Sequence, residues 1–335
     1  MSIIETLKDR IRGKGLRIVF PEGGDVRLKP VIETLCTEDL ARPVLLFETR
    51  AALEQVGDLP ESVTCLAVDD PQLAQEWAGR FRAQNQRVGE KRLLRGFPKP
   101  LHAGAIILGA GGAEAMVAGL AVPTEEVIRT AFTYLGLTDG LKAPSSLFLM
   151  RIPGFAGSEG EAMIFADCGV QPAPDSEALA QIALTTAQTA VDLLGWEPRV
   201  AFLSFSTDGS ARHDRVDHVR KAVHLAQIRA PGLKIDGEFQ LDTAIVPEIA
   251  ARKLTRPSEV AGRANILIFP DLDAGNTAYK AVQRFARADA YGPFLQGFRH
   301  SVSDLSRGST DDDILGVVLM ALARAEGQRH RLSQP

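Results

Sequence analysis

Short runs of apolar residues alternate with longer stretches in which apolar residues recur every three or four positions. The short runs have the length and composition of buried strands. They comprise residues 16–20, 43–47, 63–68, 104–108, 115–117, 147–151, 163–166, 200–204 and 266–269. Because strands and helical stretches alternate, the pattern predicts an α/β fold with a mainly parallel sheet and flanking helices.

The clearest helical stretch runs from Ser176 to Leu194, with Asp175 as its expected N-cap and Gly195 as its stop. A second helix is expected from about Asp311 to Glu326. The chain has 335 residues, which favours two domains over one. A turn-rich segment at residues 137–144 is the candidate link between them.

Composition and charge exclude several classes of protein. The net charge of −4 gives no basic field for nucleic acid or an anionic membrane, so local arginines would have to hold an anionic substrate. No stretch approaches the roughly 20 apolar residues of a membrane span, and the N-terminus carries no secretory signal pattern. Cys36, Cys65 and Cys168 are widely spaced, which favours a reduced, cytoplasmic location.

The first candidate for chemistry is Ser306-Arg307-Gly308 with Asp313, where a helix is expected to begin. A hydroxyl, a guanidinium and a helix N-terminus together can bind phosphate or an oxyanion. An aspartate one turn further on could take a proton from a thiol. The same residues also fit a plain helix start, because Thr310 and Asp313 have the spacing of a capping box. Both interpretations stay open from the residues alone.

Two further loops follow predicted strands. Residues 204–211 are rich in hydroxyls, and residues 269–280 lead from a strand through a polar loop into a helix. The carboxyl ends of parallel strands are where α/β proteins place ligands. Each loop could equally be a turn or a helix cap. Arg87 and Arg129 are candidate anion contacts, although spacing alone does not separate them from ordinary surface arginines.

Several well-known site patterns are missing from the sequence. It has no Gly-x-x-x-x-Gly-Lys-Ser/Thr phosphate loop, no complete Gly-x-Gly-x-x-Gly and no Gly-x-Ser-x-Gly. The histidines and cysteines show no metal-ligand spacing, so we expect no metal. Serine-hydrolase and zinc mechanisms therefore have little support.

Ordered motifs along nearly the whole chain make it resemble the phosphate acetyltransferase (phosphotransacetylase) family in its short form. The motifs are Ile18-Val-Phe-Pro-Glu-Gly23, Ser145-Ser-Leu-Phe-Leu-Met150, Phe165-Ala-Asp-Cys168, Leu203-Ser-Phe-Ser-Thr-Asp-Gly-Ser-Ala211, Asp236-Gly-Glu-Phe-Gln240, Ala261-Gly-Arg-Ala-Asn265, Phe269-Pro-Asp-Leu-Asp-Ala-Gly-Asn276, Gly292-Pro-Phe-Leu-Gln-Gly297 and Asp304-Leu-Ser-Arg-Gly308. Gly209-Ser-Ala-Arg-His213 and Leu40-Ala-Arg-Pro-Val44 resemble the ethanolamine-utilisation variant.

The resemblance implies a two-domain α/β fold like that of isocitrate and isopropylmalate dehydrogenases, with the active site in the cleft between the domains. The implied domains are residues 1–142 plus 300–335, and residues 143–299. The implied reaction converts acetyl-CoA and phosphate into acetyl phosphate and CoA through a ternary complex. It implies a homodimer, coenzyme A as a substrate and no tightly bound cofactor.

Site residues follow from the resemblance by motif position. Asp313 would deprotonate the CoA thiol, Ser306 would stabilise the oxyanion, and Arg307 would hold phosphate and polarise the carbonyl. Arg129 and, more loosely, Arg87 would contact CoA or phosphate. The remaining expected substrate-binding residues are Thr124, Ser206, Thr207, Ser210, Asn276 and Lys280.

The sequence departs from the family pattern at Val26, at Val122 and Pro123 in place of His-Ser, and at Ser309 in place of a cysteine. The change at Val122 and Pro123 keeps a longer acyl group, propanoyl or butanoyl, open as an alternative substrate. A non-catalytic acetyl-CoA-binding homologue is the alternative from another functional class.

Overall fold

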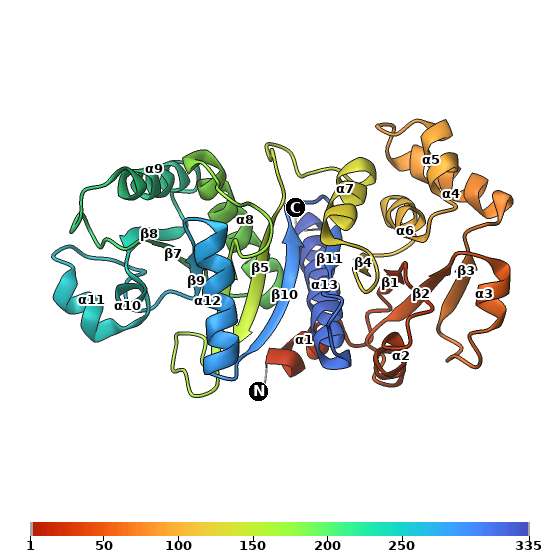
Figure 1. The fold of residues 1–335 in the computed structure, drawn as a ribbon, viewed down its shortest axis with the longest axis horizontal. Coiled ribbons are helices and arrows are strands. Elements are labelled where there is room, and N and C mark those ends of the chain that lie inside the picture. The colour runs from red at the N-terminus through yellow and green to blue at the C-terminus, as the bar shows by residue number, and fades with distance from the viewer. Residues whose placement is uncertain (1–2, 334–335) are drawn as a thin grey trace. The chain divides into compact units, whose positions relative to one another are not determined.

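The computed structural model describes residues 3–333, which form two compact units. Within these residues, unit 1 is 3–139 with 298–333, and unit 2 is Gly140–Gly297. Each has its own β-sheet (Figure 1). Among the described residues, no helix is both long enough and apolar enough to cross a membrane.

Unit 1 is built on a five-stranded sheet in the order β11-β4-β1-β2-β3, and every pairing in it is parallel. The strands are β1 (Arg17–Phe20), β2 (Arg42–Phe47), β3 (Thr64–Ala67), β4 (Ala115–Ala118) and β11 (Ser301–Asp304). Ile18, Val19, Met116 and Val302 are fully buried, as expected for a parallel sheet covered on both faces. The all-parallel sheet confirms the α/β prediction.

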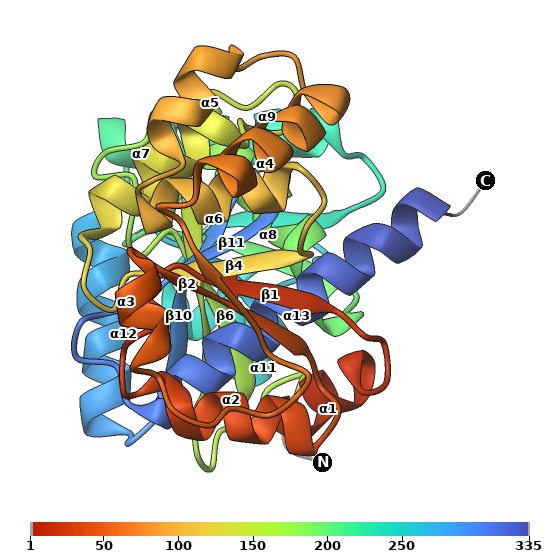
Figure 2. The same ribbon diagram turned by 90° about the vertical axis from the view of Figure 1, so that its right-hand side faces the viewer.

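Helices cover both faces of this sheet (Figure 2). One layer holds α1 (Ile3–Ile11), α2 (Leu28–Thr37) and α13 (Asp311–Ser333), and α13 packs on β11 and β4. The other layer holds α4 (Pro71–Gln84), α5 (Glu90–Gly96), α6 (Pro100–Gly109) and α7 (Thr124–Tyr134). The short α3 (Arg50–Glu54) lies beside β3.

The prediction of a strand at residues 104–108 is wrong, because this run lies inside α6. Every residue from Ala103 to Gly109 is buried, so the helix shows no polar face. A short apolar run buried on all sides does not reveal its period, and Pro100 at the helix start was the better signal.

Unit 2 has a six-stranded mixed sheet in the order β10-β5-β6-β9-β7-β8. β6, β9, β7 and β8 run parallel, whereas β5 pairs antiparallel with both β6 and β10. The strands are β5 (Ser145–Arg151), β6 (Ala162–Ala166), β7 (Arg199–Leu203), β8 (Lys234–Phe239), β9 (Ile266–Ile268) and β10 (Asp289–Gln296).

Helices also cover both faces of the second sheet. α8 (Ser176–Leu194) and α9 (Asp214–Arg229) pack together on one face, and α8 matches its predicted limits. Asp175 caps it by accepting from the Ala178 N–H at 2.8 Å, and Gly195 ends it in the left-handed conformation. The other face is covered by α10 (Leu241–Ile245), α11 (Pro247–Lys253) and α12 (Leu272–Phe285).

Three strands were missed by the sequence pattern: β8, β10 and β11. β8 reads Lys-Ile-Asp-Gly-Glu-Phe and β11 reads Ser-Val-Ser-Asp, so polar residues break the apolar run. Several of these polar residues are nevertheless buried, among them Asp236, Glu238, Ser303 and Asp304. Their burial requires partners for the polar groups, and these partners shape the candidate site.

Candidate functional site

Three loops of unit 1 meet at the carboxyl edge of its sheet. They follow β1, β4 and β11, which are neighbours in the strand order β11-β4-β1. Because all three strands are parallel, their carboxyl ends lie at the same edge. The third loop carries Ser306 and Arg307, the residues that the sequence predicts to be catalytic.

The Glu22 carboxylate holds the loop after β4. It accepts four consecutive backbone N–H groups, at distances of 2.5 to 3.1 Å. The donors are Gly119, Leu120, Ala121 and Val122. Such a row of amides would otherwise attract a phosphate. Since the protein's own carboxylate occupies it, a bound phosphate must find its donors elsewhere in the site.

Arg27 joins the same three loops. Its guanidinium pairs with Asp25 at 2.7 Å and donates to the carbonyl oxygens of Leu120 at 3.1 Å and Arg307 at 2.7 Å. Hydrogen bonding from Arg27 lowers the pKa of Asp25, so this carboxyl stays ionised. The backbone that carries Arg307 is thereby fixed to the loops after β1 and β4.

Asp304, the last residue of β11, is 1% exposed. Its Oδ2 accepts a hydrogen bond from the Thr124 hydroxyl at 2.5 Å, and its Oδ1 has no partner among residues 3–333. Burial raises the pKa of Asp304 to about 7, against the lowering effects of the Thr124 hydroxyl and of the nearby Leu305 N–H. Thr124 was predicted to bind substrate; its hydroxyl here joins the start of α7 to β11.

Gly119 makes this close approach possible. Its φ is +111°, and a Cβ at this position would lie 2.6 Å from the Leu305 carbonyl oxygen and would also overlap the Asp304 carboxyl. Only glycine fits such a conformation without strain. The loop after β4 can therefore lie directly against the loop after β11.

Ser306 and Arg307 are both exposed at the tip of the third loop. The Ser306 hydroxyl accepts a weak hydrogen bond from the Gly308 N–H at 3.3 Å. The Arg307 guanidinium makes no hydrogen bond or ion pair with any part of the chain that the structure describes. A fixed backbone with an exposed, unpaired guanidinium is an arrangement suited to binding an anion.

Asp313 forms the capping box that its spacing predicts. Its Oδ2 accepts from the Thr310 N–H at 3.0 Å and from the Thr310 hydroxyl at 2.9 Å, while its own N–H donates to that hydroxyl at 3.2 Å. The Asp313 side chain is thereby held at the start of α13, seven residues beyond Ser306 in the chain. The capping interpretation is confirmed, and it leaves the carboxylate near the loop that carries Ser306.

Positive charge gathers on the helical layer beside these loops. Burial lowers the pKa of His102 in α6, and the nearby charges of Lys99, Arg129 and Arg92 lower it further, against the opposite effect of Glu126. The three cations come from α5, from the start of α6 and from α7, and all three are exposed. Arg129 lies five residues after Thr124, roughly 7 to 8 Å along α7.

Arg87 belongs to the same layer. Its Nη1 would lie 3.0 Å from a Cβ at Gly136, two residues beyond the end of α7. Of the two arginines that the sequence predicts as anion contacts, Arg129 lies on α7, and Arg87, between α4 and α5, places its guanidinium beside the turn that follows α7. Together with Arg92 and Lys99 they form what we call the cationic surface.

The hydroxyl-rich loop of unit 2 is folded around a buried carboxylate. Glu238, 1% exposed, accepts from the Ser206 hydroxyl at 2.8 Å and from the Gly209 N–H at 2.8 Å. Ser210 accepts from the Thr207 N–H at 3.0 Å. The Thr207 hydroxyl accepts from the Gln240 N–H at 2.9 Å. All three predicted substrate-binding hydroxyls, Ser206, Thr207 and Ser210, thus bond to groups of unit 2 itself.

The structure places the other two predicted residues of unit 2 on α12. The Asn276 side chain donates to the Cys168 carbonyl oxygen at 3.1 Å, so it joins α12 to the loop after β6. Lys280 is exposed, and its Nζ lies 5.8 Å from the centre of the Tyr279 ring. Of the two, the Lys280 ammonium is the group directed to solvent.

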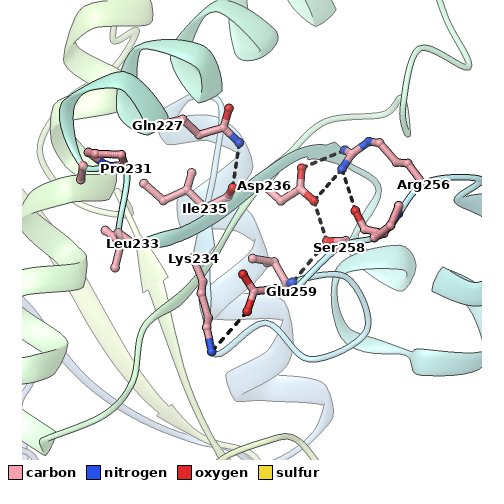
Figure 3. Close-up of a pocket in the computed structure, with 12 residues that line it drawn as sticks. Gln227, Pro231, Leu233, Lys234, Ile235, Asp236, Arg256, Ser258 and Glu259 are labelled. Atoms are coloured by element: carbon pink, nitrogen blue, oxygen red, sulfur yellow. Dashed lines mark hydrogen bonds and ion pairs between the residues drawn. The ribbon is translucent and has the colours of Figure 1, made fainter.

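Two of the cavities in unit 2 differ in character. One, of about 590 Å³, is lined by charged groups that already pair: Arg256 with Asp236 at 2.8 Å, and Ser258 with Asp236 at 2.5 Å (Figure 3). The other, of about 370 Å³, lies at the carboxyl ends of β7 and β9 and is lined in part by Phe205 and Arg215. Only the second adjoins loops that the sequence had selected.

Several residues of the unit 1 site have no role predicted from the sequence, although Glu22 and Asp304 lie within the quoted motifs: Glu22, Arg27, Asp304, Arg92 and Lys99. Glu22 and Arg27 lie in the glycine turn after the first strand, a position that in α/β proteins signals a site. Within residues 3–333, no group of three or more His, Cys, Asp or Glu side chains could hold a metal ion.

Comparison with known proteins gives full-length matches. The family model described as phosphate acetyl/butaryl transferase matches residues 2–322. A phosphate acetyltransferase of Thermoanaerobacterium thermosaccharolyticum is 39% identical over 334 residues, covering 97% of this chain and 100% of that protein. The structure of the EutD phosphotransacetylase from Staphylococcus aureus superposes with a TM-score of 0.85 at 34% identity, covering 96% of this chain and 98% of that one.

A more distant structure shows the fold alone. The 4-hydroxythreonine-4-phosphate dehydrogenase of Klebsiella pneumoniae superposes with a TM-score of 0.54 at 10% identity, over 93% of this chain and 98% of that one. The expected dehydrogenase-like α/β fold is therefore confirmed.

Proposed function

The chain belongs to the phosphate acetyl/butaryl transferase family, and we propose that it catalyses the exchange of an acetyl group between coenzyme A and inorganic phosphate. The full-length similarity to phosphate acetyltransferases supports the activity. The observation that carries the proposal is the state of Arg307. Its guanidinium is exposed and unpaired within residues 3–333, and its backbone carbonyl is held by a hydrogen bond from Arg27.

In the proposed reaction, a phosphate oxygen attacks the thioester carbonyl of acetyl-CoA. Arg307 holds the phosphate and polarises the carbonyl, and Ser306 donates to the oxygen that becomes negative in the tetrahedral intermediate. The carbon–sulfur bond then breaks, and the proton that the attacking phosphate loses passes through Asp313 to the sulfur, so that CoA leaves as a thiol. In the reverse direction, Asp313 takes the proton of the CoA thiol as the sulfur attacks acetyl phosphate. No covalent enzyme intermediate is required.

The cationic surface supports binding of the phosphate groups of CoA. Arg92, Lys99 and Arg129 all lie close enough to His102 to lower its pKa, and Arg87 places a fourth positive charge beside the turn that follows α7. A chain with a net charge of −4 needs such a local concentration to attract an anionic substrate. In unit 2, we propose that Lys280 contacts phosphate and that Asn276 stabilises the loop after β6 through its hydrogen bond to the Cys168 carbonyl oxygen.

The proposal includes a homodimer and a cytoplasmic location, as the resemblance implies. Cys36, Cys65 and Cys168 are unpaired with one another, and Cys168 is buried, which fits a reducing compartment.

The test is the release of CoA from a panel of acyl-CoAs, measured with a thiol reagent in the presence and absence of phosphate. We expect phosphate-dependent release, fastest with acetyl-CoA. A higher kcat/KM with propanoyl-CoA or butanoyl-CoA would assign the longer acyl group instead. Calorimetric binding of CoA without any turnover would identify a non-catalytic homologue and refute the proposed activity.

A further inference from the structure

The Asp304 carboxyl is a buried charged group that the proposed reaction does not use. It lies two residues before Ser306 and is 1% exposed, yet one of its oxygens has no partner within residues 3–333. Burying a carboxyl oxygen without a hydrogen-bond partner costs free energy of folding, so we expect Asp304 to have a function that offsets this cost. The only side chain described as bonded to it is Thr124, through a 2.5 Å hydrogen bond.

The contact joins two elements that the reaction needs together. Asp304 ends β11 and leads into the loop of Ser306 and Arg307, whereas Thr124 is the first residue of α7, which carries Arg129. Gly119 has no side chain, so the segment that leads into α7 lies directly against Asp304 and Leu305. The hydrogen bond between Thr124 and Asp304 is the side-chain-to-side-chain contact described between α7 and β11.

We propose that Asp304 is a positioning residue for the transfer reaction: through Thr124 it sets the position of the Ser306–Arg307 loop relative to α7. This proposal rests on the proposed function. It differs from a substrate-binding role for Thr124, because the Thr124 hydroxyl then acts through Asp304 and not on the substrate. Displacements of about 1 Å in an active site can cost 100-fold in rate, so a single hydrogen bond at this junction matters.

The surroundings of Asp304 also predict sensitivity to pH. Burial is the main cause of the raised pKa of Asp304, and the negative charge of Glu22, in the loop after β1, raises it further. Asp25 and Arg27 pair with each other, Glu125 and Glu126 follow Thr124 in α7, and Asp311 to Asp313 begin α13. A hydrogen bond to an ionised carboxylate is stronger than one to a neutral carboxyl. Protonation of Asp304 therefore loosens the junction.

The experiment is a double-mutant cycle of Asp304→Asn and Thr124→Val, with kcat and KM measured from pH 5.5 to 8.5. We expect each variant to lose on the order of 10-fold to 100-fold in kcat, with KM for CoA changed less than about twofold. The double variant should lose no more than the worse single variant, because all three variants lack the hydrogen bond from a hydroxyl to an ionised carboxylate. Thr124→Ser keeps the hydroxyl and should recover most of the loss.

The pH profile separates positioning from simple support of the fold. The wild type should lose kcat as the pH falls through about 7, and Asp304→Asn should lack this decline. Thr37→Val, at an exposed threonine bonded within α2, and Asp58→Asn, at an exposed aspartate, are the matched controls. Losses that multiply in the double variant, or single variants with the wild-type kcat and profile, would overturn the proposal.

Failure of the proposed function would be visible separately, as a wild type without phosphate-dependent turnover. The coupling of Asp304 to Thr124 would then be measured from the Tm values of the same four proteins. Additive Tm changes would refute the junction, and non-additive changes would retain it.

Discussion

Replacing Asp304 with asparagine should change how the stability of the protein depends on pH. Burial raises the pKa of Asp304 from 3.8 to about 7. The native state therefore binds one proton more than the unfolded state between these two values, and this group's contribution to stability falls as the pH rises through that window. Each pKa unit corresponds to 1.36 kcal/mol, so the rise from pH 5.5 to 7 costs about 2 kcal/mol. Above pH 7 the cost stays constant.

Asparagine has nearly the same shape and no charge, so it removes this cost. We expect the difference in free energy of unfolding, variant minus wild type, to increase by about 2 kcal/mol between pH 5.5 and pH 8.5. For a domain of this size the corresponding shift in the difference of Tm is about 4 to 8 °C. Taking differences at each pH cancels the other titrating groups, among them the buried His300, whose pKa is lowered by burial.

The assay is thermal unfolding followed by circular dichroism at pH 5.5, 7.0 and 8.5 for wild type, Asp304→Asn and Asp58→Asn. The Asp58 variant is the control for the loss of an exposed carboxyl. A difference for Asp304→Asn that stays constant with pH, or that shifts in the opposite direction, would show that burial does not raise the pKa of Asp304.

Three further predictions concern other residues of the unit 1 site. Gly119→Ala should lose on the order of 3 kcal/mol of stability or more, seen as a lower Tm, because its φ is +111° and the new Cβ would meet Leu305. Asp313→Asn should reduce kcat by 100-fold or more in steady-state assays, whereas Thr310→Val, which removes the cap but keeps the carboxylate, should cost about 1 kcal/mol of stability and retain most of the activity. Arg87→Ala and Arg129→Ala should each raise KM for CoA about 10-fold with little change in kcat, and the increase should shrink at high salt; an unchanged KM in either variant would exclude that arginine from CoA binding.

The parts of the fold that local chemistry determines could be predicted from the sequence. α8 follows from its apolar spacing, the Asp175 cap and Gly195, all of which act within a few residues. β8 and β11 could not be predicted from their patterns, because the residues that satisfy their buried polar groups are distant in the chain. Asp236 is bonded to Arg256 and Asp304 to Thr124, so the strand character depends on tertiary contacts.

The candidate site shows the same division. Thr310 and Asp313 form a capping box, which three-residue spacing alone predicts. Glu22 and Arg27 hold the loops after β1, β4 and β11 through contacts between segments about 100 to 280 residues apart. Local spacing carries no information about such pairs, so the contacts by which Glu22 and Arg27 hold the three loops together could be seen only in the structure.

The measurement that tests the central claim most directly is CoA release from acetyl-CoA by the wild type and by Arg307→Ala, with and without phosphate. We expect rapid release by the wild type that depends on phosphate and yields acetyl phosphate in equal amount. We expect Arg307→Ala, folded as judged by its circular dichroism and Tm, to be at least 100-fold slower. Release that is independent of phosphate would contradict the proposed transfer reaction, and an Arg307→Ala variant as active as the wild type would contradict the proposed role of Arg307.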